Sequence, residues 1–230
     1  MKESHDPTTL SDSTDMSLDL GRPALIAVDV QNDFVNPAGM VGRGGGDMRP
    51  LLDAVDQING LIGSARAASI PVVYVRVTHG TTVDSPAYGA RYAVRGMSVD
   101  DLLCADGTWG ADLYPDLEQP REGELVVTKH AYDGFAVNEL PTHLASLGVD
   151  TVVVTGVVTE LCVMGTVAGA FEHGFHVVVP KEATASGDPL AADAALNLIR
   201  SFYGTVTSVD EVIAAFQATH AAAGGATPTA

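Results

Sequence analysis

The sequence predicts an α/β protein, a Rossmann-like three-layer sandwich with a mostly parallel sheet of about six strands and helices on both faces. Short apolar runs rich in β-branched residues alternate along the chain with longer segments of helical periodicity. Such alternation implies right-handed crossovers, which place helices on both faces of a parallel sheet. The 230 residues are enough for one well-cored domain.

The strands are predicted from continuous apolar runs, which are typical of strands that are buried on both faces. The first, at 24–30, reads Ala-Leu-Ile-Ala-Val-Asp-Val, and the second, at 71–77, reads Pro-Val-Val-Tyr-Val-Arg-Val. The later runs have the same character and lie at 123–129, 151–156, 175–179 and 205–207.

Helices are predicted between these runs, where apolar residues recur every three or four positions. They lie at 48–68, 138–147, 161–173, 190–203 and 209–220. Gly174 follows the third of them and is typical of a helix C-terminal cap. The stretch 79–122 has no clear period, and a connection this long usually serves as a lid, a pocket wall or a subunit contact.

The chain ends differ in composition from the rest. Residues 1–20 are rich in Ser, Thr and Asp and are expected to form a flexible arm, and 221–230 a flexible tail, which leaves 21–220 as a single domain. The N-terminus has no apolar stretch typical of a signal peptide, and no run reaches the roughly 20 residues that span a bilayer. We therefore expect a cytoplasmic protein.

The net charge of the chain limits its possible binding partners, and its cysteine content argues against disulfides. The net charge of −17 argues against nucleic acid or an anionic membrane as partner, since both bind basic surfaces. Two cysteines, Cys104 and Cys162, do not make a disulfide framework.

Cys162 lies where an open α/β sheet binds its ligands. It follows the run at 151–156 after a short polar step and begins a helical pattern. The carboxyl edge of a parallel sheet is the usual ligand site, and a helix N-terminus is expected to lower the pKa of a thiol. Cys162 is therefore a candidate nucleophile, whereas Cys104 is interpreted as a small buried hydrophobic residue.

Two charged residues end other apolar strands of the same sheet. Asp29 lies within the first run, where a carboxylate is costly unless it is paired or used. Lys129 ends the third run, and by itself it is a weak signal. Together, a thiol, a carboxylate to take its proton and an ammonium to keep that carboxylate ionised make a nucleophile site.

The chain resembles the isochorismatase-like cysteine hydrolases, which include nicotinamidases, N-carbamoylsarcosine amidases and ureidoacrylate and biuret hydrolases. The resemblance spans about residues 22–216. It is carried by four segments in order: 28–34 (Val-Asp-Val-Gln-Asn-Asp-Phe), 128–135 (Thr-Lys-His-Ala-Tyr-Asp-Gly-Phe), 156–163 (Gly-Val-Val-Thr-Glu-Leu-Cys-Val) and 181–185 (Lys-Glu-Ala-Thr-Ala).

The resemblance implies a role for each matching residue. Asp29 would be the base, Lys129 its cationic partner and Cys162 the nucleophile. It also implies a cis peptide bond between Val157 and Val158, which would turn the Val158 N–H toward the Cys162 N–H to form an oxyanion hole. A homo-oligomer, dimer or tetramer, is a further implication.

The resemblance also has departures. Nicotinamidases hold a divalent metal with an Asp-x-His pair and a second His, but here Val77 stands where the Asp would be, before His79. One imidazole supplies too few ligands, so we predict no metal and no other cofactor. Relatives that hydrolyse the vinyl ether of isochorismate lack the cysteine, so its presence favours amide chemistry.

The sequence thus favours a metal-independent C–N hydrolase acting on a small amide, carbamoyl or ureido compound. The alternatives are vinyl-ether hydrolysis of isochorismate, nicotinamidase activity, or a family member that binds a small molecule without turning it over. Candidate substrate contacts are Gln31, Phe34, Trp109, Tyr132 and Phe135.

Overall fold

The computed structural model describes residues 18–94 and 102–224, which form one sheet with helices on both faces. Its strands are all parallel, in the order β3-β2-β1-β4-β5-β7, with β6 paired to β4. They are β1 (Pro23–Val28), β2 (Val72–Val77), β3 (Leu125–Lys129), β4 (Thr151–Val157), β5 (His176–Pro180), β6 (Thr184–Ala185) and β7 (Thr205–Thr207). The predicted fold class is confirmed, and the strand beyond the expected six is the two-residue β6.

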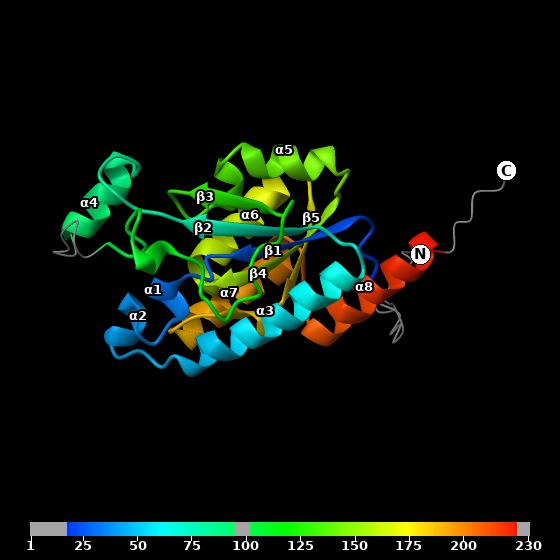
Figure 1. Cartoon of the computed structure of the whole chain (residues 1–230), viewed down its shortest axis with the longest axis horizontal. Coiled ribbons are helices and arrows are strands. Elements are labelled where there is room, and N and C mark those ends of the chain that lie inside the picture. The colour runs from blue at the N-terminus through cyan, green and yellow to red at the C-terminus, as the bar shows by residue number, and fades with distance from the viewer. Residues whose placement is uncertain (1–17, 95–101, 225–230) are drawn as a thin grey trace, which may run out of the picture.

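Two helical layers cover the sheet. The helices are α1 (Asn32–Val35), α2 (Met40–Arg43), α3 (Arg49–Ala67), α4 (Pro86–Val94), α5 (Glu139–Ser146), α6 (Met164–Glu172), α7 (Pro189–Phe202) and α8 (Val209–Gly224). Figure 1 shows α3 and α8 along one face of the sheet and α5 on the opposite side. The buried residues agree, since α3 and α8 pack in one core and α5, α6 and α7 in the other.

Alternate residues of one strand supply both cores. In β1, Leu25 and Ala27 face the α3 side, while Ile26 and Val28 face the other. Successive side chains of a strand point to opposite faces, so a strand between two helical layers must be apolar at every position. This explains why the sequence shows continuous runs rather than alternation.

The structure differs from the sequence prediction in the stretch 79–122. It contains the helix α4, which lies apart from the sheet in Figure 1. Tyr88 and Arg91 of α4 line a cavity, and none of the described side chains of this helix is fully buried. The pattern at 161–173 also begins differently, with a π turn at Thr159–Val163 before α6.

The expected chain ends are more ordered where they are described. Leu20, in the expected arm, is buried, and α8 continues through Gly224. Residues 1–17 and 225–230 lie outside the described residues. Within residues 18–94 and 102–224, no helix combines the length and apolar character needed to cross a membrane.

Parallel strands bring the ends of β1, β3 and β4 to one edge. Close contact between β1 and β4 at that edge depends on Gly156. A Cβ there would lie 2.0 Å from the carbonyl oxygen of Val28, and the backbone has a φ of +120°. Only glycine tolerates both conditions, so Gly156 sets the spacing beneath the candidate site.

Candidate active site

Asp29 directly follows β1 at the carboxyl edge of the sheet. It is fully buried, and its backbone N–H donates to the carbonyl of Val75 in β2 at 2.8 Å. Its φ of +53° lies in the left-handed region, which is uncommon for a residue other than glycine. Such backbone conformations cluster at functional sites, where the surrounding structure holds them.

Lys129 is the last residue of β3, and β2 lies between it and β1. Its side chain is buried, and its Nζ donates to Asp29 Oδ2 at 2.7 Å and to the carbonyl of Ala131 at 2.9 Å. The ammonium therefore reaches past the end of β2 to the carboxylate. Two charges removed from water in this way depend on each other, because neither has solvent to replace its partner.

Cys162 completes the group from the π turn between β4 and α6. Its side chain is buried and interacts electrostatically with Asp29 and Lys129. Burial, reinforced by the negative charge of Asp29, raises the pKa of the Cys162 thiol. This corrects the expectation that a helix N-terminus lowers it: the thiol precedes α6 and lies in a dry site beside a carboxylate.

Burial also shifts the pKa values of Asp29 and Lys129. It raises the pKa of Asp29, and the charge of Lys129 opposes this only in part. Burial acts against the ammonium of Lys129 as well, but the charge of Asp29 and the contacts of Cys162 outweigh it, so the pKa of Lys129 is raised. The ion pair thus favours the charged forms of Asp29 and Lys129, whereas burial favours the neutral thiol of Cys162.

One carboxylate oxygen of Asp29 is left open. Oδ2 accepts from Lys129, whereas the buried Oδ1 has no hydrogen-bond partner among the described residues. A buried, unsatisfied oxygen is costly and calls for an explanation. Because the Cys162 thiol interacts with this carboxylate, Oδ1 is a candidate acceptor of the thiol proton.

The backbone before the thiol has an unusual form. The peptide bond between Val157 and Val158 is cis, and Val158 lines the same cavity as Cys162. The oxyanion hole formed by the N–H groups of these two residues stays a prediction.

A small cavity of about 150 Å³ opens onto the thiol. Its walls are mostly apolar and aromatic, and they consist of Phe34, Val77, His79, Tyr88, Arg91, Leu103, Tyr132, Val158, Leu161 and Cys162. Of the predicted substrate contacts, Phe34 and Tyr132 line this cavity.

The other predicted contacts have different surroundings. Gln31 is buried and uses its amide as a structural tie: Nε2 donates to the carbonyls of Val77 and Ala111, and Oε1 accepts from the Val77 N–H. Phe135 is buried against the rings of His173 and Phe175. Trp109, 48% exposed, is also absent from the cavity wall. Gln31, Phe135 and Trp109 are therefore absent from the wall of this cavity, and their roles as substrate contacts stay predictions.

The sequence indicated that 79–122 could form a pocket wall, but it did not predict that a helix, α4, contributes to it. His79 is buried, its Nδ1 lies 2.8 Å from Asp84 Oδ1, and its ring stacks on Tyr88 at 4.6 Å. His79 was considered only as a metal ligand, and the described residues contain no group of three or more His, Cys, Asp or Glu arranged to hold a metal. In the sequence, His79 and Asp84 lie five residues apart just after a strand, and this spacing is the signal that could have indicated their contact.

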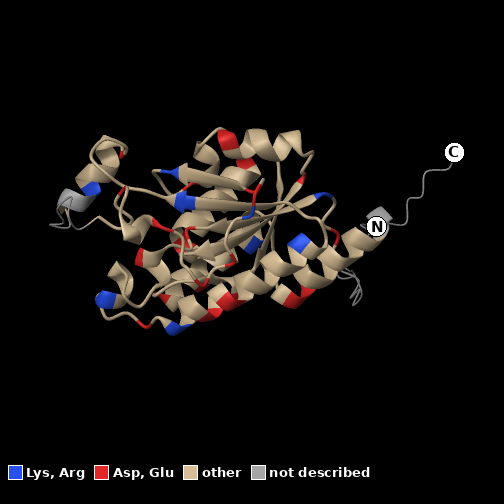
Figure 2. Cartoon of the chain, in the orientation of Figure 1, with Lys and Arg blue, Asp and Glu red and all other residues tan. Residues whose placement is uncertain are grey.

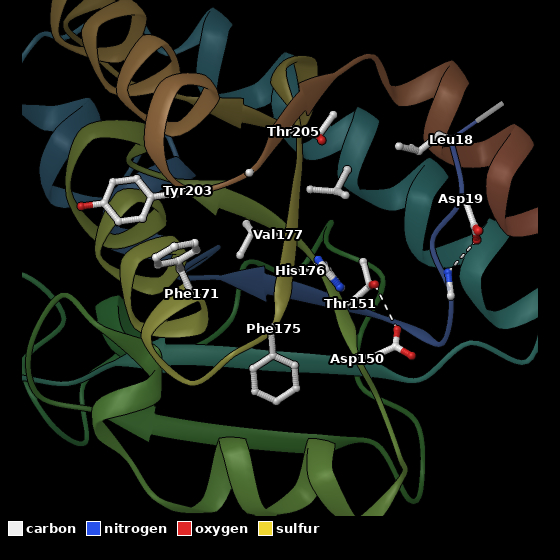
Figure 3. Close-up of a pocket in the computed structure, with 13 residues that line it drawn as sticks. Leu18, Asp19, Asp150, Thr151, Phe171, Phe175, His176, Val177, Tyr203 and Thr205 are labelled. Carbon is white, nitrogen blue, oxygen red and sulfur yellow. Dashed lines mark hydrogen bonds between the residues drawn. The ribbon is translucent and has the colours of Figure 1, made fainter. Parts of the chain in front are cut away.

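A larger hollow of about 450 Å³ lies at the opposite edge of the sheet. Its wall includes Thr151 and His176, the first residues of β4 and β5. Figure 3 shows the rings of Phe171 and Tyr203 close together on one side of this hollow. Neither cysteine lines it, so volume alone does not locate the reactive group.

Comparison with known proteins gives concordant matches. The sequence profile of the isochorismatase domain matches residues 23–211. The ureidoacrylate amidohydrolase RutB of Pseudomonas savastanoi pv. phaseolicola (strain 1448A / Race 6) is 31% identical over 207 residues, covering 85% of this chain and 84% of the relative.

Solved structures agree. A cysteine hydrolase from Pseudomonas syringae pv. phaseolicola 1448A is 25% identical with a TM-score of 0.76, covering 89% of this chain and 97% of that one. N-carbamoylsarcosine amidase from Thermoplasma acidophilum is 28% identical with a TM-score of 0.66, covering 82% and 97%.

Proposed function

The chain belongs to the isochorismatase family, and we propose that it is a metal-independent cysteine amidohydrolase. Its substrate would be a small amide, carbamoyl or ureido compound, whose C–N bond is cleaved through a thioester. The observation that carries the proposal is the 2.7 Å contact between Lys129 Nζ and Asp29 Oδ2, which leaves Asp29 Oδ1 open beside the buried thiol.

The first half of the reaction forms the thioester. The Cys162 thiol gives its proton to Asp29 Oδ1 as the sulfur attacks the substrate carbonyl carbon. The carbonyl oxygen becomes an oxyanion, to which the N–H groups of Val158 and Cys162 donate. Asp29 then returns the proton to the leaving nitrogen, the C–N bond breaks, and the amine or ammonia departs.

The second half releases the acid. Water attacks the thioester carbonyl and gives a proton to Asp29, which again acts as base. The C–S bond breaks, the acid product leaves, and the sulfur recovers its proton from Asp29. Lys129 stays charged throughout, and it keeps Asp29 ionised whenever Asp29 does not hold the transferred proton.

The raised pKa values of Asp29 and Cys162 suit this sequence of transfers. A thiol with a raised pKa is not a standing thiolate, so its nucleophile must form by proton transfer during attack. A carboxylate with a raised pKa is a stronger base than an exposed one.

The named relatives support the substrate class. They include a ureidoacrylate amidohydrolase and an N-carbamoylsarcosine amidase, whose names both describe compounds with a carbamoyl nitrogen. A metal of the nicotinamidase kind does not fit these residues, since Val77 offers no ligand atom and His79 Nδ1 is engaged by Asp84. A homo-oligomer and a cytoplasmic location stay predictions.

The direct test removes the sulfur. Cys162→Ala is expected to lower ammonia release from a panel of amides and ureas by about 10³-fold or more, because the covalent step is lost. Cys104→Ala is the matched control, since Cys104 is also buried but does not line the cavity. Circular dichroism and urea unfolding establish that both variants are folded.

The other outcomes separate the alternatives. Wild-type rates in Cys162→Ala on a confirmed amide substrate would refute the nucleophile. Pyruvate release from isochorismate that does not need Cys162 would indicate vinyl-ether hydrolysis. Tight binding without turnover across the panel would indicate a binding protein.

A further inference from the structure

The cavity beside Cys162 has one permanently charged group in its described wall, the guanidinium of Arg91. Asp29 and Lys129 interact with the thiol but do not line the cavity. They are buried and paired with each other. The rest of the wall is apolar or aromatic apart from His79 and Cys162. A ligand in this cavity therefore meets a single fixed positive charge.

Arg91 has no carboxylate partner among the described residues. Arg22, Arg49 and Arg66 do have carboxylate partners, whereas the described arginines Arg43, Arg76, Arg121 and Arg200 also lack one. What distinguishes Arg91 from these four is its place in the wall of the cavity beside Cys162. None of the salt bridges in residues 18–94 and 102–224 includes Arg91. This occurs in a protein with 29 acidic and 12 basic residues.

The helix that carries Arg91 also has no acidic residue. In α4, Arg91 is the one charged side chain, and this helix carries blue and no red in Figure 2. The nearest acid before it in the sequence, Asp84, is already used: Oδ1 lies 2.8 Å from His79 Nδ1 and Oδ2 accepts from the Gly80 N–H at 3.1 Å. Its negative charge is therefore committed to the loop that precedes the helix.

Contacts on both sides hold α4 against the cavity. Tyr88 stacks on His79 with ring centroids 4.6 Å apart, and the ring of Tyr132 lies 5.6 Å from Tyr88. Tyr88 and Arg91 are three residues apart, which places them on the same face of the helix. The face that Tyr88 anchors is therefore the face from which Arg91 lines the cavity.

We propose that Arg91 binds a carboxylate of the substrate and so selects ureido or carbamoyl acids over uncharged ureas and amides. The inference rests on the proposed function, whose reacting carbonyl would lie at Cys162 while the acid group lies at Arg91. A guanidinium binds a carboxylate through two parallel N–H···O bonds, which fix orientation as well as charge. It also attracts an anion that the net charge of −17 repels.

The test compares substrates that differ in charge. Ammonia release is measured with 3-ureidopropionate and ureidoacrylate, which are acids, and with N-butylurea, which is uncharged. The wild-type protein is expected to prefer the acids in kcat/KM. In Arg91→Gln this preference should fall about 10- to 100-fold, mainly through a higher KM for the acids, since a charged hydrogen-bonding partner is lost.

Two further variants exclude a merely structural effect. Arg91→Lys keeps the charge but not the paired geometry, so it should recover part of the preference. Arg200→Gln is the matched control, because Arg200 is exposed on α7 and hydrogen-bonds to Asn197, and the preference should not change. An unchanged preference in Arg91→Gln would overturn the inference.

Binding separates this inference from the proposed function. The Cys162→Ala variant is titrated calorimetrically with 3-ureidopropionate, with and without Arg91→Gln. Binding that weakens about 10-fold or more on loss of Arg91, while the protein with Cys162 intact releases no ammonia from any of the three compounds, would support the inference and refute the hydrolase. Hydrolysis of all three compounds at equal rates, with or without Arg91, would support the hydrolase and refute the role of Arg91.

Discussion

The two edges of the sheet each have a hollow, and the smaller one has the reactive group. The hollow at the amino ends of β4 and β5 has about 450 Å³, and the cavity beside Cys162 about 150 Å³. What differs is the backbone: at the carboxyl edge, parallel strands end together and their following residues converge. The proposed chemistry lies at that convergence and not at the larger hollow.

The two edges also differ in how deeply an ion pair is buried. The side chains of Arg22 and Asp150 at the amino edge are 73% and 42% exposed, while those of Lys129 and Asp29 are 1% and 0% exposed. At Asp150, hydrogen bonds from Arg22 and Thr151 outweigh burial, so the pKa of Asp150 is lowered. At Asp29, burial outweighs the partner, so its pKa is raised. A pair of a basic residue and an aspartate is thus a surface contact at one edge, and at the other it contains the proton acceptor of the proposed mechanism.

The largest expected contrast is in activity. Asp29→Asn should lower kcat/KM about 10²- to 10⁴-fold, because the general base is lost, whereas Asp150→Asn should leave it within about twofold. Rates are referred to the folded fraction from urea unfolding. Comparable losses in both variants would show that the carboxyl edge has no special role.

A second contrast is in stability. Lys129→Met should destabilise the fold by about 3–5 kcal/mol near pH 8, because it leaves a buried carboxylate without a partner. Arg22→Met should cost less than about 1 kcal/mol, as expected for an exposed pair. Urea unfolding of both variants measures the difference, and equal costs would contradict the contrast between buried and exposed pairs.

The deficit of Lys129→Met should also depend on pH. Asp29 in the fold has a pKa above its ordinary value of 3.8, so the folded state holds the proton more tightly than the unfolded chain. Its contribution to stability is therefore present at low pH and is lost as pH rises through the folded pKa. The deficit should widen from pH 5 to pH 8, and Asp29→Asn added to Lys129→Met should remove most of that widening.

The smallest expected effect is at the larger hollow. His176 is exposed there at the start of β5, and Figure 3 shows it among the lining side chains. His176→Ala should change kcat/KM by less than about twofold and stability by no more than about 0.5 kcal/mol, as for ordinary surface substitutions. A loss of activity above tenfold at unchanged stability would reveal a second site at the amino edge.

Sequence reasoning was sufficient for the features that are local and periodic. The runs around 24–30 and 151–156 are apolar at every position because β1 and β4 lie between two helical layers. Once the sheet is parallel, Asp29, Lys129 and Cys162 must all lie at one edge, since each follows a strand. Their grouping therefore follows from order along the chain.

Tertiary structure decided the features that depend on neighbours distant in sequence. Gln31 looked free to meet a substrate until Val77 and Ala111 were seen to occupy its amide. The raised pKa of Cys162 depends on burial and on the charge of Asp29, a residue more than 100 positions away in the sequence. The sequence by itself determined the layers and the reactive residues, because strand periodicity and strand ends are written in consecutive residues. Only the folded chain decided the cavity wall from α4 and the protonation of the thiol, because packing and dielectric environment arise between segments that the sequence keeps apart.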